Sequence, residues 1–224
     1  MAVLNHEQVA ALYDRIADRY DLLTLSFRAL GFGRYQRRLI GDLGLSAGDT
    51  VVDFCCGTGV NFEGLSAAVG PRGQVIGVDL SDGMLAKARE RIQSAGLQNV
   101  SLIQTDVTDY RLPSDTAAVL STFGLEMAPT YDDVVRHVAD DLSDGGRLGL
   151  LGLKHPEGWP EWLVRVGIKA TASFGVSSDY EGFTPWLSAD EHFRRRAFDQ
   201  HFIGAAYSYV GEKDRSGPIA PQRH

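Results

Sequence analysis

Thr50-Val51-Val52-Asp53-Phe54-Cys55-Cys56-Gly57-Thr58-Gly59-Val60-Asn61 is the stretch of sequence that decides the fold. An apolar run rich in β-branched residues that ends at turn residues predicts a buried strand of a parallel sheet. Gly57 and Gly59 lack the Cβ atoms that would stop the backbone from closing tightly around a ligand. A strand, a glycine turn and a helix form half of a nucleotide-binding βαβ unit. Asp53, at the end of the strand, is therefore expected to face the contents of the turn.

Two further apolar strands are predicted at residues 73–80 and 100–104, and each also ends at an acid. Asp79 closes the first of them, where a carboxylate is placed to accept both hydroxyls of a ribose. Asp106 follows the second. Three successive strands that end in acids suit a nucleoside lying across the carboxyl ends of a parallel sheet.

The turn itself separates two kinds of nucleoside ligand. A dinucleotide site has the pattern G-x-G-x-x-G, in which a pyrophosphate rests on the N-terminus of the following helix. Here Cys55 and Gly57 are followed by Val60-Asn61-Phe62, with no third glycine. This counts against a nicotinamide dehydrogenase, which is the rival enzyme class.

The segment from Asp53 to Gly59 resembles the first motif of the class I S-adenosylmethionine-dependent methyltransferases, acid-x-Gly-x-Gly-x-Gly, with Cys55 in place of the first glycine. Asp79-Leu80-Ser81-x-x-Met84-Leu85 resembles the second motif, in which Leu80 and Met84 would flank the adenine. Met84 as ordinary core filler is the alternative. At Asp106-Val107 the resemblance implies that the acid accepts the adenine amino group and that the next N–H meets a ring nitrogen. The cofactor-binding residues implied in this way are Tyr20, Asp53, Cys55, Gly57, Thr58, Gly59, Asp79, Leu80, Met84, Asp106, Val107 and Ser121.

A helix predicted over residues 7–21 carries the pattern Tyr13-x-x-x-Ala17-x-x-Tyr20-Asp21. This is similar to the N-terminal helix of the ubiquinone and menaquinone C-methylases and of the related bacterial phosphatidylethanolamine N-methyltransferases. The resemblance implies that Tyr20 approaches the methionine end of the cofactor, and the alternative is that it only packs on the domain. Residues 1–45 are expected to form a helical lid, although residues 22–39 could equally be the first core helix. The arginines at 34–38 would allow peripheral contact with an anionic lipid surface.

Three residues are candidates for the acceptor side. Glu126 lies in the loop after the fourth predicted strand, 117–123, and His155 follows the fifth, 147–153. Ligands of open α/β sheets bind at this edge. His155 is the preferred base, because the reference pKa of histidine is about 6.5. Glu126 is expected to orient the acceptor, and Tyr20 completes the set. The alternative for His155 is a structural role at the strand end.

The expected fold class is α/β, a Rossmann-like, mainly parallel, seven-stranded sheet with helices on both faces and an N-terminal helical lid. Two closing strands near residues 196–202 and 204–211 supply an antiparallel last strand. The predicted methyltransferase domain covers residues 1–213, and the Gly- and Pro-containing residues 214–224 are expected to be a disordered tail. These last strands favour the short phospholipid N-methyltransferase type, whereas the N-terminal half favours the quinone C-methylases.

The composition of the chain limits the number of domains and the kinds of partner that it can have. The chain has 224 residues, of which 44% are hydrophobic, so a single domain can build an ample core. A net charge of −7 argues against sequence-independent nucleic-acid binding. Two adjacent cysteines without nearby metal-ligand spacing predict neither a disulfide framework nor a metal site, and they suit a reducing cytoplasm. No signal peptide or membrane span is predicted.

The predicted function is methyl transfer from S-adenosylmethionine to a partly apolar small molecule, such as an amine, a lipid or a quinone-like compound. Because a sulfonium methyl is already an activated electrophile, positioning of the acceptor can supply most of the acceleration. The identity of the acceptor and the atom that is methylated stay open. A protein of this fold that runs a non-methyl reaction or senses the cofactor is the alternative.

Overall fold

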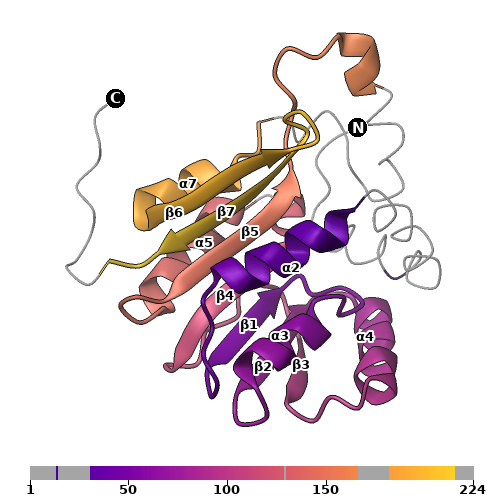
Figure 1. The fold of residues 1–224 in the computed structure, drawn as a ribbon, viewed down its shortest axis with the longest axis vertical. Coiled ribbons are helices and arrows are strands. Elements are labelled where there is room, and N and C mark those ends of the chain that lie inside the picture. The colour runs from indigo at the N-terminus through magenta and orange to yellow at the C-terminus, as the bar shows by residue number, and fades with distance from the viewer. Residues whose placement is uncertain (1–13, 15–30, 129, 166–181, 215–224) are drawn as a thin grey trace.

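One mixed sheet of seven strands organises the chain, with helices packed on both of its faces (Figure 1). The computed structural model describes residue 14 and residues 31–128, 130–165 and 182–214. The strand order is β3-β2-β1-β4-β5-β7-β6. The predicted fold class, Rossmann-like α/β with a mainly parallel sheet, is confirmed.

The strands form where the sequence predicts them, with shifts of one or two residues at their ends. In chain order they are β1 Thr50–Phe54, β2 Gln74–Asp79, β3 Val100–Gln104, β4 Thr116–Thr122, β5 Arg147–Leu153, β6 Arg194–His201 and β7 Ala206–Glu212. The pairs among β1 to β5 are parallel. β7 is antiparallel to both of its neighbours, β5 and β6, so the predicted antiparallel last strand is present.

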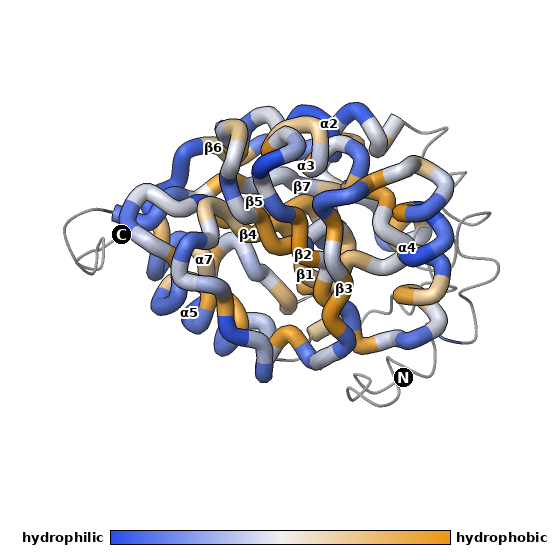
Figure 2. The backbone as a smooth tube through the Cα atoms, turned by 90° about the horizontal axis from the view of Figure 1, so that it is seen from below, coloured by the Kyte–Doolittle hydropathy of each residue, from blue (hydrophilic) through white to orange (hydrophobic). Residues whose placement is uncertain are grey.

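Two apolar layers hold the helices onto the sheet. Side chains of α2, α3 and α4 pack with one face of the strands, and side chains of α5 and α7 pack with the other. Figure 2 shows the apolar strands enclosed between these helices. The helices are α2 Phe32–Asp42, α3 Phe62–Val69, α4 Asp82–Ser94, α5 Tyr131–Asp141 and α7 Pro185–His192. No described helix is long and apolar enough to cross a bilayer.

α2 is the part of the predicted lid segment that the structure describes. Its residues Phe32, Leu39 and Ile40 are buried, and Leu39 and Ile40 belong to the same apolar cluster as the first strand. This region therefore follows the core-helix alternative. Residues 1–13 and 15–30 lie outside the described residues, and so do residues 215–224, nearly all of the predicted tail.

The order of strands reverses at the middle of the sheet, between β1 and β4. β1 is buried along its whole length and pairs with β2 on one side and β4 on the other. The chain runs outward from β1 to β3, then crosses back to β4 and continues outward to β5. Open α/β sheets bind their ligands outside the carboxyl ends of the strands at such a reversal point. The turns after β1 and β4 lie at this reversal point.

Candidate active site

The turn after β1 is held in a conformation that favours glycine. Cys55, Gly57 and Gly59 all have positive φ, at 53°, 54° and 74°. A Cβ on Gly59 would overlap the ring of Phe62, so that glycine is needed for packing. A Cβ on Gly57 would instead meet no atom within 4 Å. The backbone at Gly57 therefore borders open space, as a close approach to a ligand requires.

Cys55 is the position where this turn departs from the methyltransferase pattern. Its side chain is accommodated because Gly124, in the loop after β4, presents no Cβ of its own; one placed there would overlap Cys55 Cβ. Burial raises the pKa of the Cys55 thiol well above its usual range, and the carboxylates of Asp79, Glu126, Asp53 and Asp106 raise it further. The thiol is therefore protonated at neutral pH, and a protonated thiol is a poor nucleophile.

Asp79 fixes the turn and the start of α4 together. Its carboxylate accepts hydrogen bonds from the backbone N–H of Gly57 at 2.8 Å and of Ser81 at 2.9 Å. Burial raises the pKa of Asp79, and these backbone hydrogen bonds oppose that rise because they favour the ionised form. The carboxylate lies at the end of β2, in the place that the sequence predicts for a ribose-binding acid.

Asp53 is a fully buried acid with few partners. Asn61 Nδ2 reaches its two carboxylate oxygens at 3.3 Å and 3.2 Å, and also reaches Thr122 Oγ1 at 3.0 Å. Burial raises the pKa of Asp53 to about 7, because these weak hydrogen bonds compensate only part of the desolvation. Two further buried acceptors, Asn61 Oδ1 and Ser121 Oγ, find no hydrogen-bond partner among the described residues.

This cluster of unsatisfied oxygens fits the cationic end of S-adenosylmethionine, which carries an ammonium and a sulfonium. Buried acceptors without partners cost free energy, and a bound cation would satisfy them. Gly57, which borders open space, lies between Asp53 and Asn61 in the chain, and its N–H donates to Asp79. The residues present therefore fit the cofactor that the sequence pattern predicts, with Asp53, Asn61 and Ser121 at one end and Asp79 at the other.

The remaining predicted cofactor residues differ in how they are placed. Thr58 and Met84 are 1% exposed, and Val107 is 8% exposed. Met84 thus also serves as core filler, the alternative given by the sequence. Leu80 is partly exposed at the same edge. The carboxylate of Asp106 accepts hydrogen bonds from Thr108 N at 2.9 Å and Thr108 Oγ1 at 2.8 Å.

Asp14 is the described residue of the N-terminal segment, and it reaches the same edge. Its carboxylate accepts hydrogen bonds from Ser81 Oγ at 2.5 Å and from Gly83 N at 3.0 Å. A carboxylate at these first N–H groups of α4 is stabilised by the helix dipole. Asp14 therefore contacts the chain two residues beyond Asp79, at Ser81. Tyr20, predicted for this segment, lies outside the described residues.

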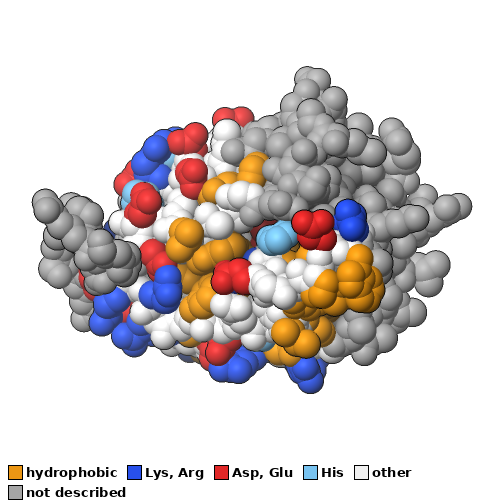
Figure 3. All heavy atoms as spheres, turned by 90° about the horizontal axis from the view of Figure 1, so that it is seen from above, with side chains coloured by type: hydrophobic (Ala, Val, Ile, Leu, Met, Phe, Trp, Pro, Cys, Tyr) orange, Lys and Arg blue, Asp and Glu red, His pale blue; other side chains and the backbone are white. Residues whose placement is uncertain are grey.

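The loop after β4 contains a second acid, Glu126, which is half-buried. Glu126 lies on a short 3₁₀ turn after β4, Leu125–Met127, and accepts a hydrogen bond from Tyr207 Oη at 3.0 Å. Burial raises the pKa of Glu126 to about 7, while the bond from Tyr207 lowers it. Figure 3 looks onto this edge of the molecule and shows hydrophobic side chains gathered between acidic ones.

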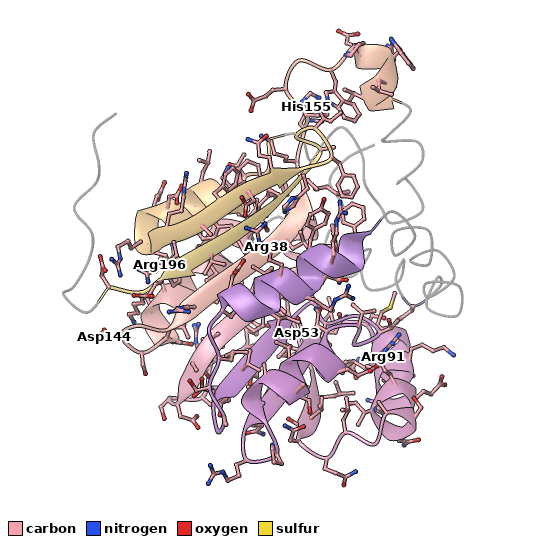
Figure 4. All side chains as sticks on the ribbon, viewed as in Figure 1. Arg38, Asp53, Arg91, Asp144, His155 and Arg196 are labelled. Carbon is pink, nitrogen blue, oxygen red and sulfur yellow. The ribbon has the colours of Figure 1, made fainter. Side chains whose placement is uncertain are left out.

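His155 is placed differently from Glu126. It follows β5 as predicted, but its side chain is exposed. Figure 4 shows it in the loop beyond the end of β5, well apart from Asp53 in the interior. The structure thus brings Glu126 into the neighbourhood of the cofactor turn, through Cys55, and leaves His155 at the surface.

Three residues of the site are absent from the sequence prediction. Asn61 had a local signal, since an amide directly after the glycine turn can reach back to the strand-end acid. Asp14 and Tyr207 had none, because each reaches the site only through tertiary structure. Among the described residues, no group of three metal-ligating side chains comes together.

The fold and the site define a class I S-adenosylmethionine-dependent methyltransferase. The model of the ubiE/COQ5 methyltransferase family matches residues 1–160, and the chain belongs to this family. The demethylmenaquinone methyltransferase of Listeria welshimeri is 27% identical over 226 residues, which cover 97% of this chain and 94% of the relative. S-adenosylmethionine is accordingly the cofactor.

Solved structures show the same fold at lower identity. A SAM-dependent methyltransferase from Aquifex aeolicus superposes with a TM-score of 0.57 at 18% identity, covering 80% of this chain and 89% of that chain. The phosphoethanolamine N-methyltransferase 2 of Haemonchus contortus, solved with phosphomonomethylethanolamine and S-adenosylhomocysteine, gives a TM-score of 0.62 at 14% identity. It covers 81% of this chain and 53% of that one. These likenesses concern the fold.

Proposed function

We propose that this methyltransferase transfers a methyl group to a ring carbon of a quinone of the demethylmenaquinone type, in its reduced, hydroxyl-bearing form. The oxidised ring is electron-poor and cannot attack an electrophile, whereas a hydroxyl on the ring makes the adjacent carbon nucleophilic. When bound, S-adenosylmethionine supplies an activated methyl group. The family membership and the relative from Listeria support a quinone acceptor.

The character of the acceptor side is the observation that carries this proposal. Glu126 accepts a hydrogen bond from Tyr207, which belongs to a group of packed aromatic rings. The ring of Trp186 lies 4.5 Å from that of Tyr207, and the ring of Phe198 lies 6.1 Å from it, between centroids. A half-buried carboxyl held by aromatic residues suits a partly apolar acceptor that bears a hydroxyl.

The cofactor-binding residues are proposed from the geometry of the turn after β1 and of the ends of β2 and β3. Asp79 holds the ribose, the turn at Gly57 lies against the cofactor, and Asp53 with Asn61 and Ser121 holds its cationic end. Leu80, Met84, Asp106 and Val107 are proposed for the adenine. The domain boundary at residue 213 is retained as a proposal, and the two free cysteines fit a reducing compartment such as the cytoplasm.

The acceptor residues are proposed as Glu126, His155 and Tyr20. Glu126 and His155 come from the loops after β4 and β5, at the edge where acceptors of this fold would enter. The amine class is the second candidate for the acceptor. It is favoured by the fold likeness to the Haemonchus enzyme and by the closing β6–β7 hairpin.

The test is transfer of labelled methyl from S-adenosylmethionine under anaerobic conditions. The purified chain is given chemically reduced demethylmenaquinone, the oxidised quinone or phosphoethanolamine, in parallel reactions. The expected result is label in the reduced quinone alone, with a product heavier by one methylene group. Label only in the amine would overturn the quinone assignment. Cofactor binding without label in any acceptor would favour the sensor or non-methyl alternative.

A further inference from the structure

Glu126 is a half-buried acid for which the sheet leaves a dedicated space. Gly152, the sixth residue of β5, lies beneath the carboxyl group, and a Cβ on Gly152 would overlap Glu126 Oε1. Any other residue at position 152 would displace this carboxyl. The absence of a side chain in the middle of an otherwise leucine-rich strand is therefore explained by Glu126.

The hydrogen-bond donor to Glu126 comes from the neighbouring antiparallel strand. Tyr207 pairs with Gly152 in the β5–β7 register, so its side chain stands beside the space that the glycine leaves. Tyr207 is 0% exposed, and its hydroxyl donates to Glu126 Oε1 at 3.0 Å. Two paired positions, one without a side chain and one with a phenol, thus fix the carboxyl.

Two groups near this carboxyl, Tyr207 and Cys55, are uncharged at neutral pH. Burial raises the pKa of Tyr207 and of the Cys55 thiol well above their usual ranges, so both stay protonated. Tyr131, from α5, interacts with Tyr207. Lys154, at the end of β5, pairs with Glu157 at 3.3 Å and lies 5.8 Å from the Trp186 ring centroid. The described residues provide no ion pair to Glu126.

Burying a carboxyl without a cation destabilises a fold, and a purely structural role would be served equally well by glutamine. Strand order places Glu126 on the acceptor side. The proposed ribose and adenine acids follow β2 and β3, on one side of β1, whereas Glu126 follows β4 on the other. Glu126 also interacts with Cys55, the first residue of the cofactor turn. The acid thus lies next to the turn, on the side away from the nucleoside.

We propose that Glu126 accepts the hydroxyl proton of the methyl acceptor, and that Tyr207 and Gly152 hold its carboxylate in position to do so. This inference rests on the proposed function. A pKa near 7, raised by burial, makes the carboxylate about as basic as a histidine and therefore a useful base at neutral pH. Glu126 takes the place that the sequence assigned to His155.

The proton and the electrons balance over one turnover. The hydroxyl proton moves to a Glu126 oxygen, and its electron pair stays on the acceptor. The adjacent ring carbon then forms the new bond to the methyl carbon, while sulfur keeps the pair of the broken carbon–sulfur bond. The ring carbon next loses its hydrogen as a proton to water, and Glu126 returns its proton to the oxygen. One proton is released for each methyl group transferred.

Single-turnover rates with saturating labelled cofactor and reduced demethylmenaquinone test this role. Glu126→Gln keeps the shape and an acceptor for Tyr207, and should slow transfer by about 10²–10³-fold, the range typical of a lost general base. Gly152→Ala should slow it by about tenfold or more, because the new methyl group displaces the carboxyl. The matched controls are Glu191→Gln, on the exposed surface of α7, and Gly149→Ala, whose Cβ meets only leucines of the core at 3.0–3.4 Å.

A second readout does not depend on turnover. In protein labelled with ¹³C at the glutamate carboxyl, one resonance should titrate near neutral pH and be absent from Glu126→Gln. Tyr207→Phe should move that titration to higher pH, since the lost hydrogen bond favoured the ionised form. The pH at which the rate of methyl transfer falls on the acidic side should rise by the same amount. If Tyr207 only packs in the core, Tyr207→Phe would leave the pH dependence of the rate unchanged.

The outcomes separate this inference from the proposed function. If the wild-type chain methylates the reduced quinone and Glu126→Gln stays within about threefold of it, the base assignment is wrong and the function stands. A loss confined to His155→Gln in the same assay would likewise overturn it in favour of His155. Failure of the wild-type chain itself with every quinone would instead remove the proposed acceptor. Calorimetric cofactor affinity shows that each variant is folded.

Discussion

The proposed cofactor half and the proposed acceptor half of the site each contain a half-buried acid, Asp79 and Glu126, but the fold supports the two acids in different ways. Asp79 accepts two backbone N–H groups, and its partners lie 22 and 2 residues away in the chain. Glu126 accepts one phenol hydroxyl from 81 residues away. The first acid is fixed by a local turn and a helix start, whereas the second depends on the pairing of β5 with β7.

This difference matches the two tasks. A cofactor shared by a whole class of enzymes needs the same backbone cradle each time, and a short strand–turn–helix segment provides it. The acceptor varies from enzyme to enzyme, so its surroundings are built from side chains that distant strands bring together. Substitutions in the cofactor half should therefore change the affinity for S-adenosylmethionine, and substitutions in the acceptor half should change the rate of methyl transfer.

The largest effect on cofactor affinity is expected at Gly57. Gly57→Ala should weaken S-adenosylmethionine binding by about a hundredfold, or about 2.7 kcal/mol, because the new Cβ enters the space left for the cofactor. Gly96→Ala is the matched control. Gly96 also has positive φ, 65° against 54°, and a Cβ there also meets nothing within 4 Å, but it lies at the end of α4. Equal calorimetric affinities for the two variants would show that the turn does not hold the cofactor.

Asp79→Ala should weaken cofactor binding by at least about tenfold, since a charge-assisted hydrogen bond contributes roughly 1.5–3 kcal/mol. Asp109→Ala, an exposed acid just beyond β3, should leave affinity unchanged. Calorimetry measures the affinity of both variants for S-adenosylmethionine. A folded Asp79→Ala chain with wild-type affinity would remove this acid from the ribose site.

The contrast between the halves also explains what the sequence could predict. The strand ends, Asp53, Asp79 and the turn at Gly57 were predicted because all of them lie within one local pattern. Asn61 was missed although its position was local. Glu126 was predicted at the acceptor edge, but its role was assigned to orientation and the base to His155, because reference pKa values favour histidine. Burial raises the pKa of Glu126, and sequence does not show burial.

The contacts of Tyr207 and Gly152 with Glu126 could not be predicted from the sequence. Nothing near Tyr207 in the chain indicates Glu126 as its partner. Gly152 looks like a weak point in an apolar strand until the carboxyl above it is seen. The antiparallel β5–β7 register, which pairs these two residues, is a property of the folded sheet. The positions of individual side chains in the acceptor half could therefore be found only from the structure.

The raised pKa of Glu126 predicts a pH-dependent cost in stability. The folded state binds this proton more tightly than the unfolded state does, so stability falls as pH rises from about 4.5 towards about 7. Glu126→Gln removes the cost and should raise Tm at pH 8 by several degrees, at roughly 2–4 °C per kcal/mol, with little change at pH 4. Thermal unfolding of Glu191→Gln serves as the control. An equal Tm gain at both pH values would mean that the carboxyl is not ionising in the fold.

The smallest effect is expected at Cys55. Its φ of 53° is a left-handed conformation that costs a residue with a side chain roughly 1–2 kcal/mol, and relief of this strain offsets part of the lost packing in Cys55→Gly. Cofactor affinity and turnover should both stay within about threefold of wild type. A loss of methyl transfer with intact cofactor binding would give the thiol a role in the acceptor half that its raised pKa argues against.

The division of labour between the two halves is tested most directly by single-turnover methyl transfer to reduced demethylmenaquinone as a function of cofactor concentration, in Asp79→Ala and Glu126→Gln side by side. The account predicts that saturating S-adenosylmethionine restores most of the rate in Asp79→Ala and none of the lost rate in Glu126→Gln. The opposite pattern, with Glu126→Gln rescued by cofactor and Asp79→Ala slow at saturation, would contradict it.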